Sequence, residues 1–324
     1  MTKKHFSKIG LAYMIGTLLV FGFQYLAEFL IVRFLPQVYD NSTLNFLLVM
    51  LSMYAVSMPL MGFIISRIPA EGSCESQKMT VGRWFKIFVI AYAGMYITNL
   101  IGNFITQIIS IFKGSAVSNN LIEIISANDS WCNFLVIVIF APIAEELLFR
   151  KLLIDRTIKY GQGISILTSA LLFGLFHGNL NQFVYAFTIG AVFAYVYSKT
   201  GKIHYTILMH MLINFLGSVV SLLIFKLSGF WEITSIDSTD TAAVMEIMSN
   251  HIGGIILLIL YFVALLAMVI TGIVLFCVNV KKIKLEKTEY TIEKGKRFTT
   301  YFVNIGMIAF AIYWIVMIVI QLLR

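Results

Sequence analysis

Long apolar runs, separated by short polar stretches, recur along most of the chain. A run of roughly 18 or more apolar residues predicts a membrane-spanning helix, because a ~30 Å hydrocarbon core needs about 20 residues at 1.5 Å each. Nine candidate spans follow, at about 9–32, 44–65, 87–112, 131–149, 164–180, 183–198, 205–225, 252–280 and 299–323. The pattern therefore predicts an all-α fold: a single integral membrane domain over 1–324, with about eight to nine transmembrane helices.

The middle of this pattern is its least regular part. The fourth run leads directly into charged sequence at Arg150, and only Asn181 and Gln182 separate the fifth run from the sixth. The first run is too long for a cleavable signal peptide, carries Glu28 near its far end and has no small-residue cleavage site. We therefore expect the first run to remain as a helix of the bundle.

The lysines and arginines predict an orientation for these spans. Cytoplasmic segments of membrane proteins carry an excess of Lys and Arg. With a cytoplasmic amino terminus, 20 of the 24 basic residues fall in inside segments, namely the first eight residues and the stretches around 66–86, 150–160, 199–204 and 281–298. The same topology predicts an acidic extracellular loop at 226–251. It also predicts a basic cytoplasmic loop at 281–298, either a solvated connector or a surface helix on anionic lipid.

Composition supports a membrane protein and excludes several other classes. Apolar residues make up 59% of the chain and charged residues 12%, against roughly 45–50% and about 25% in soluble domains. An aromatic content of 14% excludes disorder, and three widely separated cysteines exclude a disulfide framework. The net charge of +8 is too thinly spread for nucleic-acid binding. We expect a multi-pass protein of the cell membrane that has membrane lipid, and no nucleic acid, as a partner.

Polar residues interrupt three of the predicted helices, where they are costly and therefore indicate function. They fall in APIAEELLFRKLL of the fourth run, ALLFGLFHGN of the fifth and TILMHMLINFLGS of the seventh. The residues concerned are Glu145, Glu146 and Arg150; Phe173, His177 and Asn179; and His210 and Asn214. Small residues nearby are expected to let helices approach closely: Ser169, Ala170, Gly174, Gly190 and Ala194.

Helical spacing suggests how the first two clusters meet. Glu146 and Arg150 are four residues apart and can pair on one face, which leaves Glu145 free. Glu145 lies 16 residues before the turn at Gly161 and His177 lies 16 after it, so both are ~24 Å from that turn along their helices. We expect them to face one another across an antiparallel hairpin. The charged stretch 150–159 is expected to project into the cytosol, so that the pocket opens on the cytoplasmic side.

The chemistry that these residue types support is hydrolysis. A carboxylate held away from bulk water can act as a general base on a water molecule. Histidine can bind the same water molecule or act as a metal ligand. Asparagine can donate a hydrogen bond to a developing oxyanion. A serine or cysteine nucleophile is not supported, because no Gly-x-Ser-x-Gly occurs and no cysteine has a histidine nearby in sequence.

The three motifs EExxxR, FxxxH and HxxxN, in this order, resemble the family of CAAX prenyl endopeptidases and bacteriocin-processing or bacteriocin-immunity proteins. The resemblance covers a catalytic core at about 130–218. It implies an intramembrane endopeptidase of a bacterial plasma membrane, acting on a peptide or membrane-protein substrate. By position, the resemblance assigns catalysis to Glu145 as the base, His177 as its partner, His210 and Asn214 on the oxyanion side, and Glu146.

The remaining motif residues are assigned supporting roles by the same resemblance. Arg150 would pair with Glu146, and Phe173 would pack around His177. The family is described both as zinc-dependent and as metal-free and glutamate-dependent. The HExxH pair of common zinc peptidases is missing here, but Glu145, His177 and His210 are a set that zinc accepts. The sequence leaves both mechanisms open.

Two other classes of function compete with the peptidase. In the first, a non-enzymatic membrane immunity or scaffold protein keeps the motifs as structure, with the glutamates in an ion-pair network, His177 packed between helices and Asn214 joining helices. In the second, a transporter would scatter ionisable residues along a path through the membrane. The clustering of these residues in three motifs favours the peptidase over the transporter.

Overall fold

The computed structural model describes residues 1–117, 128–237, 239–286, 288, 290 and 292–323. Two of the basic residues counted above, Lys287 and Arg324, lie outside the described residues. In the described part of the chain all regular secondary structure is helical, and there is no strand. Eight of its helices are long and apolar enough to cross a membrane. The predicted all-α, multi-pass membrane fold is therefore confirmed.

The first half of the chain forms three long helical units. Helix α1 is followed by the single turn α2, and α3 and α4 form one continuous rod through a π-helical segment. The bounds are α1 Thr2–Phe34, α2 Pro36–Tyr39, α3 Ser42–Leu51, the π-helical Ser52–Ser57, α4 Met58–Ser66 and α5 Val81–Lys113.

The fourth unit and the two that follow it carry the predicted core. The fourth unit is built from α7 Ser130–Asn133, the π-helical Phe134–Phe140, α8 Ala141–Glu146, the π-helical Leu147–Leu152, α9 Leu153–Thr157 and a short 3₁₀ turn Ile158–Tyr160. After it come α10 Gln162–Phe176, α11 Leu180–Thr200, α12 Ile203–Asn214, the π-helical Phe215–Val220 and α13 Ser221–Leu227.

The last third of the chain adds two long helices to this bundle. The elements are α14 Phe230–Ser235, α15 Thr241–Asn250, α16 Ile252–Asn279, the 3₁₀ turns Val280–Lys282 and Lys294–Lys296, α17 Arg297–Tyr301 and α18 Ile305–Leu323. The predicted loop 226–251 thus contains two short helices, α14 and α15. The described residues between 283 and 293 form no helix, and the choice between a solvated connector and a surface helix on anionic lipid stays a prediction.

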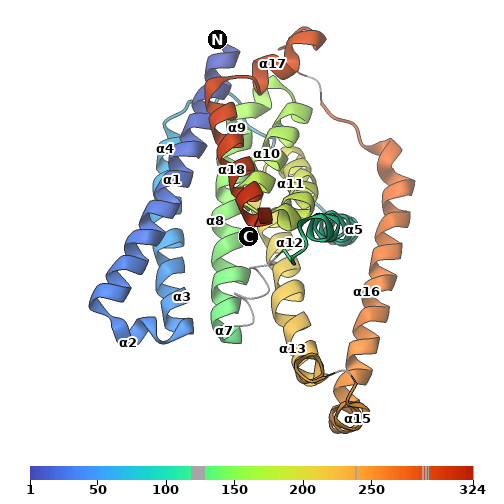
Figure 1. Cartoon of the computed structure of the whole chain (residues 1–324). Coiled ribbons are helices and arrows are strands. Elements are labelled where there is room, and N and C mark those ends of the chain that lie inside the picture. The colour runs from blue at the N-terminus through green and yellow to red at the C-terminus, as the bar shows by residue number, and fades with distance from the viewer. Residues whose placement is uncertain (118–127, 238, 287, 289, 291, 324) are drawn as a thin grey trace.

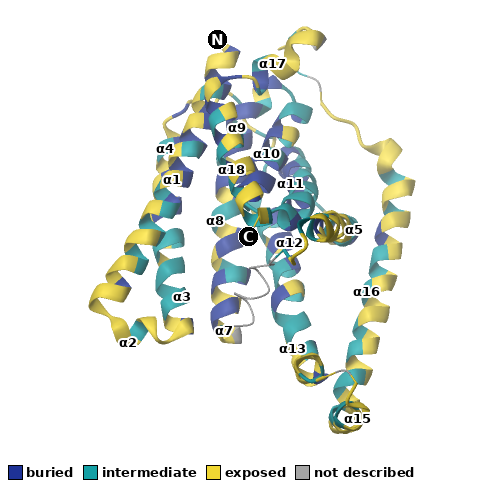
Figure 2. Cartoon of the chain, viewed as in Figure 1, coloured by how far each residue is buried: buried dark blue, intermediate teal, exposed yellow. Residues whose placement is uncertain are grey.

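The helices enclose a central layer made by α8 to α12 (Figure 1). Helices α1 and α16 run lengthwise on opposite flanks, whereas α5 is seen almost along its axis and so crosses them steeply. Buried residues concentrate in the central helices, and α16 is largely exposed along its length (Figure 2). An apolar helix with so little protein around it fits a lipid environment.

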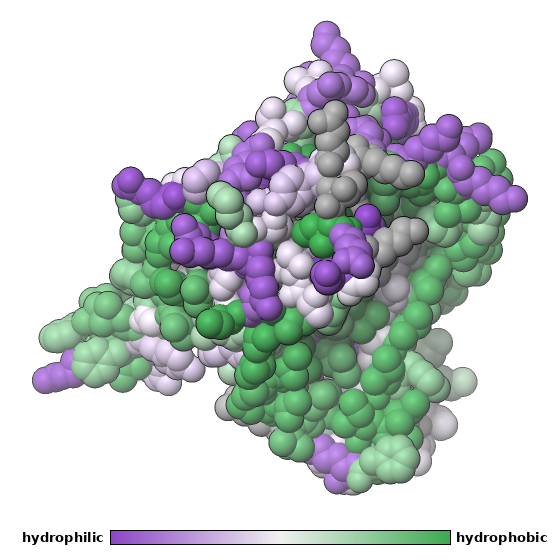
Figure 3. All heavy atoms as spheres, turned by 90° about the horizontal axis from the view of Figure 1, so that it is seen from above, coloured by the Kyte–Doolittle hydropathy of each residue, from purple (hydrophilic) through white to green (hydrophobic). Residues whose placement is uncertain are grey.

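The segments predicted to share one side of the membrane gather at one end of the bundle. The backbone N–H of Gln77 donates to the carbonyl of Thr200, and Lys159 pairs with Glu71 at 2.9 Å. Viewed onto this end, hydrophilic residues cover the surface and apolar residues form the flanks (Figure 3). We call it the basic end. The grouping agrees with the predicted topology, whereas the assignment of the basic end to the cytoplasm stays a prediction.

The fifth predicted span, 164–180, is wrong as a full crossing. Helix α10 has 15 residues, so it is about 22 Å long, less than the ~30 Å hydrocarbon core. It ends at Phe176, because Gly178 adopts a left-handed backbone (φ 66°) and the Asn179 side chain accepts from the Gln182 N–H to start α11. The fifth and sixth runs are therefore two legs of a tight hairpin.

Small residues bring the two legs of this hairpin close together, as predicted. A Cβ added at Gly174 would lie 3.2 Å from the Phe183 carbonyl oxygen, and one at Gly190 would lie 3.3 Å from the Ala170 Cα. The first and last long helices meet in the same way. A Cβ at Gly10 in α1 would lie 2.3 Å from the backbone of Gly306 in α18.

The charged stretch 150–159 does not project freely, which corrects the sequence-based expectation. The fourth unit stays helical to Tyr160, and Arg150 and Arg156 are buried in it. The Arg156 guanidinium donates to the carbonyls of Leu152, Ile65 and Ser66. Backbone carbonyls thus replace water around this cation, because the ends of α4 and α9 pack together.

Candidate active site

The two glutamates of the first motif lie on a helical segment of six residues. Helix α8 is flanked by π-helical segments on both sides, and such interruptions of a helix are frequent at functional sites. On the upstream side the interruption has a local cause, since Pro142 has no N–H to donate to the preceding turn. The sequence therefore sets Glu145 and Glu146 at an irregular point of the bundle.

Glu146 is the centre of a buried charge cluster. Its Oε1 lies 3.1 Å from the Arg150 Nη2 and accepts a hydrogen bond from the His210 Nδ1 at 3.1 Å. The side chains of Glu146 and Arg150 are fully buried. A buried carboxylate persists as an ion only when it is paired. The predicted i, i+4 ion pair is present, and it also holds the imidazole of His210.

Glu145 lies on the other side of the same imidazole. Its Oε2 is 3.8 Å from the His210 Nε2. The Glu145 side chain keeps 13% of its surface exposed, whereas Glu146 keeps none. Of the two neighbouring carboxylates, Glu145 is thus the one that a substrate or water can reach.

An aromatic shelf packs against these groups. The Arg150 guanidinium carbon lies 4.2 Å from the centre of the Phe173 ring and 5.6 Å from that of Phe193. The Phe173 ring also meets the rings of His177 and His210 edge-on, with centroid distances of 4.9 and 5.9 Å. Phe173 therefore joins the second and third motifs and supplies cation–π stabilisation to a buried arginine.

His177 stands at the end of α10, just before the Gly178 turn. Its Nδ1–H donates to the Phe173 carbonyl at 2.8 Å, which leaves Nε2 as an acceptor in the neutral ring. Among the described residues it forms neither a hydrogen bond nor an ion pair with Glu145. The two side chains that were expected to face one another are therefore not in direct polar contact, and their equal depth stays a prediction.

Asn214 is placed away from the charge cluster, one turn further along α12 than His210. Its Nδ2 donates to the Ile137 carbonyl at 2.8 Å. That carbonyl lacks a normal helical partner, because Pro142 has no N–H and the Ala141 N–H bonds to Val136. The amide of Asn214 thus joins α12 to the π-helical segment that precedes the glutamates.

Asn179 has a structural position in the hairpin. Its side chain accepts from the Gln182 N–H at 2.7 Å and so caps α11. Asn181 follows it and bonds Asn103 and Thr106 of α5. These contacts satisfy polar groups at a turn buried between helices, as membrane proteins require.

Three further side chains adjoin the site and lie outside the motifs. Tyr54 and Tyr185 are close enough to Glu145 to interact with it electrostatically. Phe193 completes the shelf, with its ring centroid 5.5 Å from that of His210. Tyrosine and phenylalanine are common in this sequence, and no spacing marks these three. Only tertiary packing distinguishes them.

The side chains of this site do not form a metal-binding set. No group of three His, Cys, Asp or Glu side chains in the described part of the chain converges as metal ligands. In the predicted zinc set, His210 approaches Glu145 at 3.8 Å, and the bond from the His177 Nδ1 to a backbone carbonyl leaves Nε2 as the nitrogen that could bind zinc. Glu145, His177 and His210 would need to move closer together to hold zinc.

Comparison with known proteins gives a match over the same region. The sequence model of a family described as "Type II CAAX prenyl endopeptidase Rce1-like" matches residues 127–216, close to the predicted core at 130–218. The segment that carries the three motifs is thus similar in sequence to this family. The match covers less than a third of the chain.

One relative extends the comparison beyond the core. "Putative membrane peptidase YdiL" of Bacillus subtilis (strain 168) is 27% identical over 161 residues, which make up 47% of this chain. The aligned region spans 62% of that relative's length. No solved structure matches the chain. The family resemblance thus rests on the segment that carries all three motifs.

Proposed function

We propose that the protein is an intramembrane endopeptidase that hydrolyses a peptide bond of a peptide or membrane-associated protein. The observation that carries the proposal is the position of Glu145, a partly accessible carboxylate with the His210 imidazole at 3.8 Å. The neighbouring Glu146 is fully buried and already paired with Arg150. The two glutamates therefore have different roles in this proposal. Glu145 acts on the water and the substrate, and Glu146 positions His210.

In this proposal Glu145 acts as general base. It takes a proton from a water molecule while the water oxygen bonds to the carbonyl carbon of the substrate. Collapse of the tetrahedral intermediate breaks the carbon–nitrogen bond, and the proton held by Glu145 passes to the leaving amine. The water is consumed, and the carboxylate returns to its initial state. A positioned base of this kind contributes about 10²–10⁴-fold to rate.

The histidines act on opposite sides of this reaction. Glu146 fixes His210 through Nδ1, so Nε2 faces Glu145 and, when it carries a proton, can donate to the charge that develops on the substrate oxygen. The Phe173 carbonyl fixes His177 through its Nδ1, which leaves its Nε2 to accept a hydrogen bond from the water and orient it. Each imidazole is thus oriented by a bond at its other nitrogen, as catalytic histidines usually are.

The experiment compares Glu145→Gln with Glu28→Gln, which neutralises a carboxylate of α1 far from the motifs in sequence. Cells that express each variant are compared with wild type by mass spectrometry of secreted peptides and membrane-protein termini. We expect Glu145→Gln to abolish the cleavage products that wild type generates and Glu28→Gln to retain them. The thermal stability of each purified variant reports whether it is folded.

The proposal fails if folded Glu145→Gln generates the same cleavage products as wild type. If wild type generates none and a bacteriocin-protection phenotype survives in Glu145→Gln, the protein is a non-enzymatic immunity protein. In that case the buried ion pair and the Asn214 bond are architectural.

A further inference from the structure

A large apolar cavity lies apart from the proposed active site, between α10 and α18. Its volume is about 680 Å³, within the ~300–1,000 Å³ range of ligand pockets. Apolar side chains make up its whole lining, among them Leu171, Leu175 and Phe183 on one side and Phe302, Ala311 and Ile315 on the other. A cavity of this composition suits a hydrocarbon chain and no polar ligand.

A second, polar hollow adjoins this cavity at the basic end. It has a volume of about 830 Å³ and lies between the first turns of α1 and the start of α18. Lys3, Lys4 and Ser7 line it, and it shares Val303 and Ile308 with the apolar cavity. One ligand with an apolar tail and a polar head can therefore occupy both.

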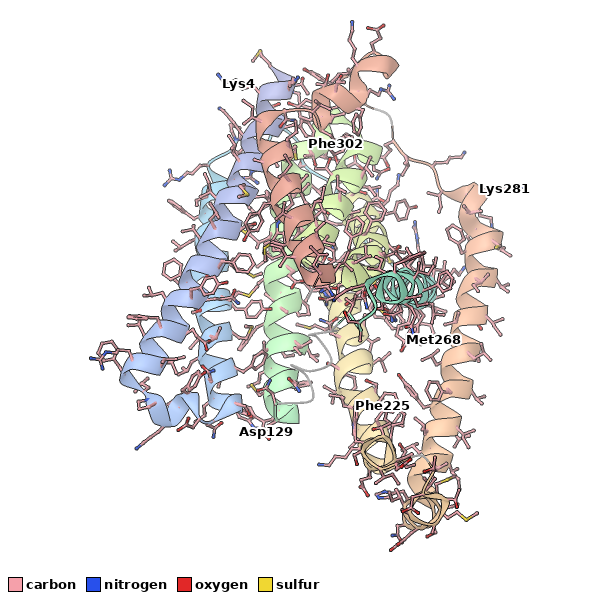
Figure 4. All side chains as sticks on the ribbon, in the orientation of Figure 1. Lys4, Asp129, Phe225, Met268, Lys281 and Phe302 are labelled. Atoms are coloured by element: carbon pink, nitrogen blue, oxygen red, sulfur yellow. The ribbon has the colours of Figure 1, made fainter. Side chains whose placement is uncertain are left out.

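The lysines that line the polar hollow indicate the charge of the ligand's polar head. Lys3 and Lys4 are exposed, and neither forms an ion pair among the described residues. No carboxylate is among the described residues that line either hollow. Lys4 stands at the basic end, on the α1 side of the bundle (Figure 4). Two uncompensated ammonium groups at a membrane surface favour an anionic lipid.

We propose that these joined hollows hold an anionic phospholipid, with an acyl chain between α10 and α18 and its phosphate at Lys3 and Lys4. None of the predicted site residues lines either hollow. Leu172 of the lining is, however, the neighbour of Phe173 in α10. The bound lipid thus packs against the outer face of α10, the helix that carries the second motif.

The test measures thermal unfolding of the purified full chain in detergent, with added phosphatidylglycerol or phosphatidylcholine of the same acyl chains. We expect phosphatidylglycerol to raise the melting temperature at lower concentration than phosphatidylcholine, because ligands of the native state stabilise it. The double variant Lys3→Gln/Lys4→Gln should weaken the response to phosphatidylglycerol roughly 30-fold. Its response to phosphatidylcholine should stay as in wild type.

Two further variants separate this site from general surface charge. Lys281→Gln/Lys282→Gln removes two lysines at the end of α16, on the opposite flank of the basic end (Figure 4), and should keep the wild-type preference. Ala311→Phe fills the apolar cavity and should weaken the response to both lipids, while its melting temperature without lipid reports folding.

Equal responses of wild type to the two lipids would overturn the proposal. So would an unchanged preference in Lys3→Gln/Lys4→Gln, or the same loss in the Lys281→Gln/Lys282→Gln control. If farnesol stabilises the protein through the Ala311-lined cavity and phosphatidylglycerol does not, the cavity binds an uncharged isoprenoid chain and the lipid assignment is wrong.

Discussion

At the scale of single residues, the site is a chain of ionisable groups in which each group lies beside the next. Arg150 balances Glu146, Glu146 holds His210, and His210 approaches Glu145. Removing one partner of a buried pair typically costs about 3–5 kcal/mol. In the proposed reaction, Glu146 and Arg150 are therefore positioning residues, and the more exposed Glu145 is the base.

The arrangement of donors predicts how the activity responds to metal removal. Because no three donors converge in the described residues, we expect peptide hydrolysis to persist after extensive dialysis of the purified enzyme against EDTA. Activity is measured on a substrate found in the cleavage comparison, with a known zinc peptidase treated in parallel as the control.

A different result would identify the metal ligands. If dialysis abolishes activity and added Zn²⁺ restores it, the three donors predicted from the sequence, Glu145, His177 and His210, must come together in the working enzyme. His177 would then offer Nε2, since its Nδ1 is bonded to the Phe173 carbonyl.

At the scale of elements, the irregular fourth unit depends on a bond from its neighbour. Asn214 of α12 donates to the Ile137 carbonyl that Pro142 leaves without a donor. We expect Asn214→Ala to lower the unfolding free energy by about 1–3 kcal/mol, as for an unsatisfied buried carbonyl. In a Pro142→Ala background the backbone N–H is restored, so the same substitution should cost less.

A double-mutant cycle in detergent measures this coupling. We expect an interaction free energy of about 0.5 kcal/mol or more between the two positions. Asn214→Ala costing the same in both backgrounds would show that the amide does not replace the missing N–H. A large loss of kcat at unchanged stability would instead support the oxyanion role that the resemblance assigns to Asn214.

Sequence periodicity predicted the class of fold and most helices, because a hydrocarbon core forces long apolar runs. It predicted the Glu146–Arg150 pair, since spacing on one helix fixes which side chains meet. It failed at the fifth run, where a left-handed Gly178 and a capping Asn179 end α10 early. Hydropathy does not register such turns, because the residues on both sides of them remain apolar.

The sequence predicted which residues form the site better than it predicted which contacts those residues make. All seven motif residues lie in the central helices, but the partner of Asn214 is a backbone carbonyl that no sequence pattern marks. Tyr54, from a different helical unit, adjoins Glu145 only through packing. Spacing within one helix was informative, whereas contacts between helices depend on π-helical segments that shift the register by one residue.

At the scale of the whole molecule, the basic end is held together by contacts between loops. The Lys159 ammonium donates to the Glu71 carboxylate at 2.9 Å and holds the pKa of Glu71 below its usual range. This contact joins the loop after α4 to the end of the fourth helical unit. Because Glu71 is 35% exposed, water screens the pair, and it is worth about 0.2–1 kcal/mol.

The lowered pKa predicts a pH dependence of stability. A carboxyl whose pKa is lower in the folded protein stabilises it above the unfolded pKa of about 4.3, and this stabilisation is lost as pH falls through the folded pKa. We expect Glu71→Gln to lower the melting temperature slightly near pH 7 and to match wild type at strongly acidic pH. Glu75→Gln on the same loop, a carboxylate without an ion pair among the described residues, serves as control. A constant difference across this pH range would contradict the assignment.

The close contact of Gly10 with Gly306 has a consequence for biogenesis. Helix α1 leaves the ribosome long before its partner α18, from which it is separated by nearly 300 residues. At about 5–20 residues per second, roughly 15–60 s pass between their syntheses. During that interval the surface of α1 around Gly10 lacks its partner helix in the bilayer, and a chaperone or insertase can bind there.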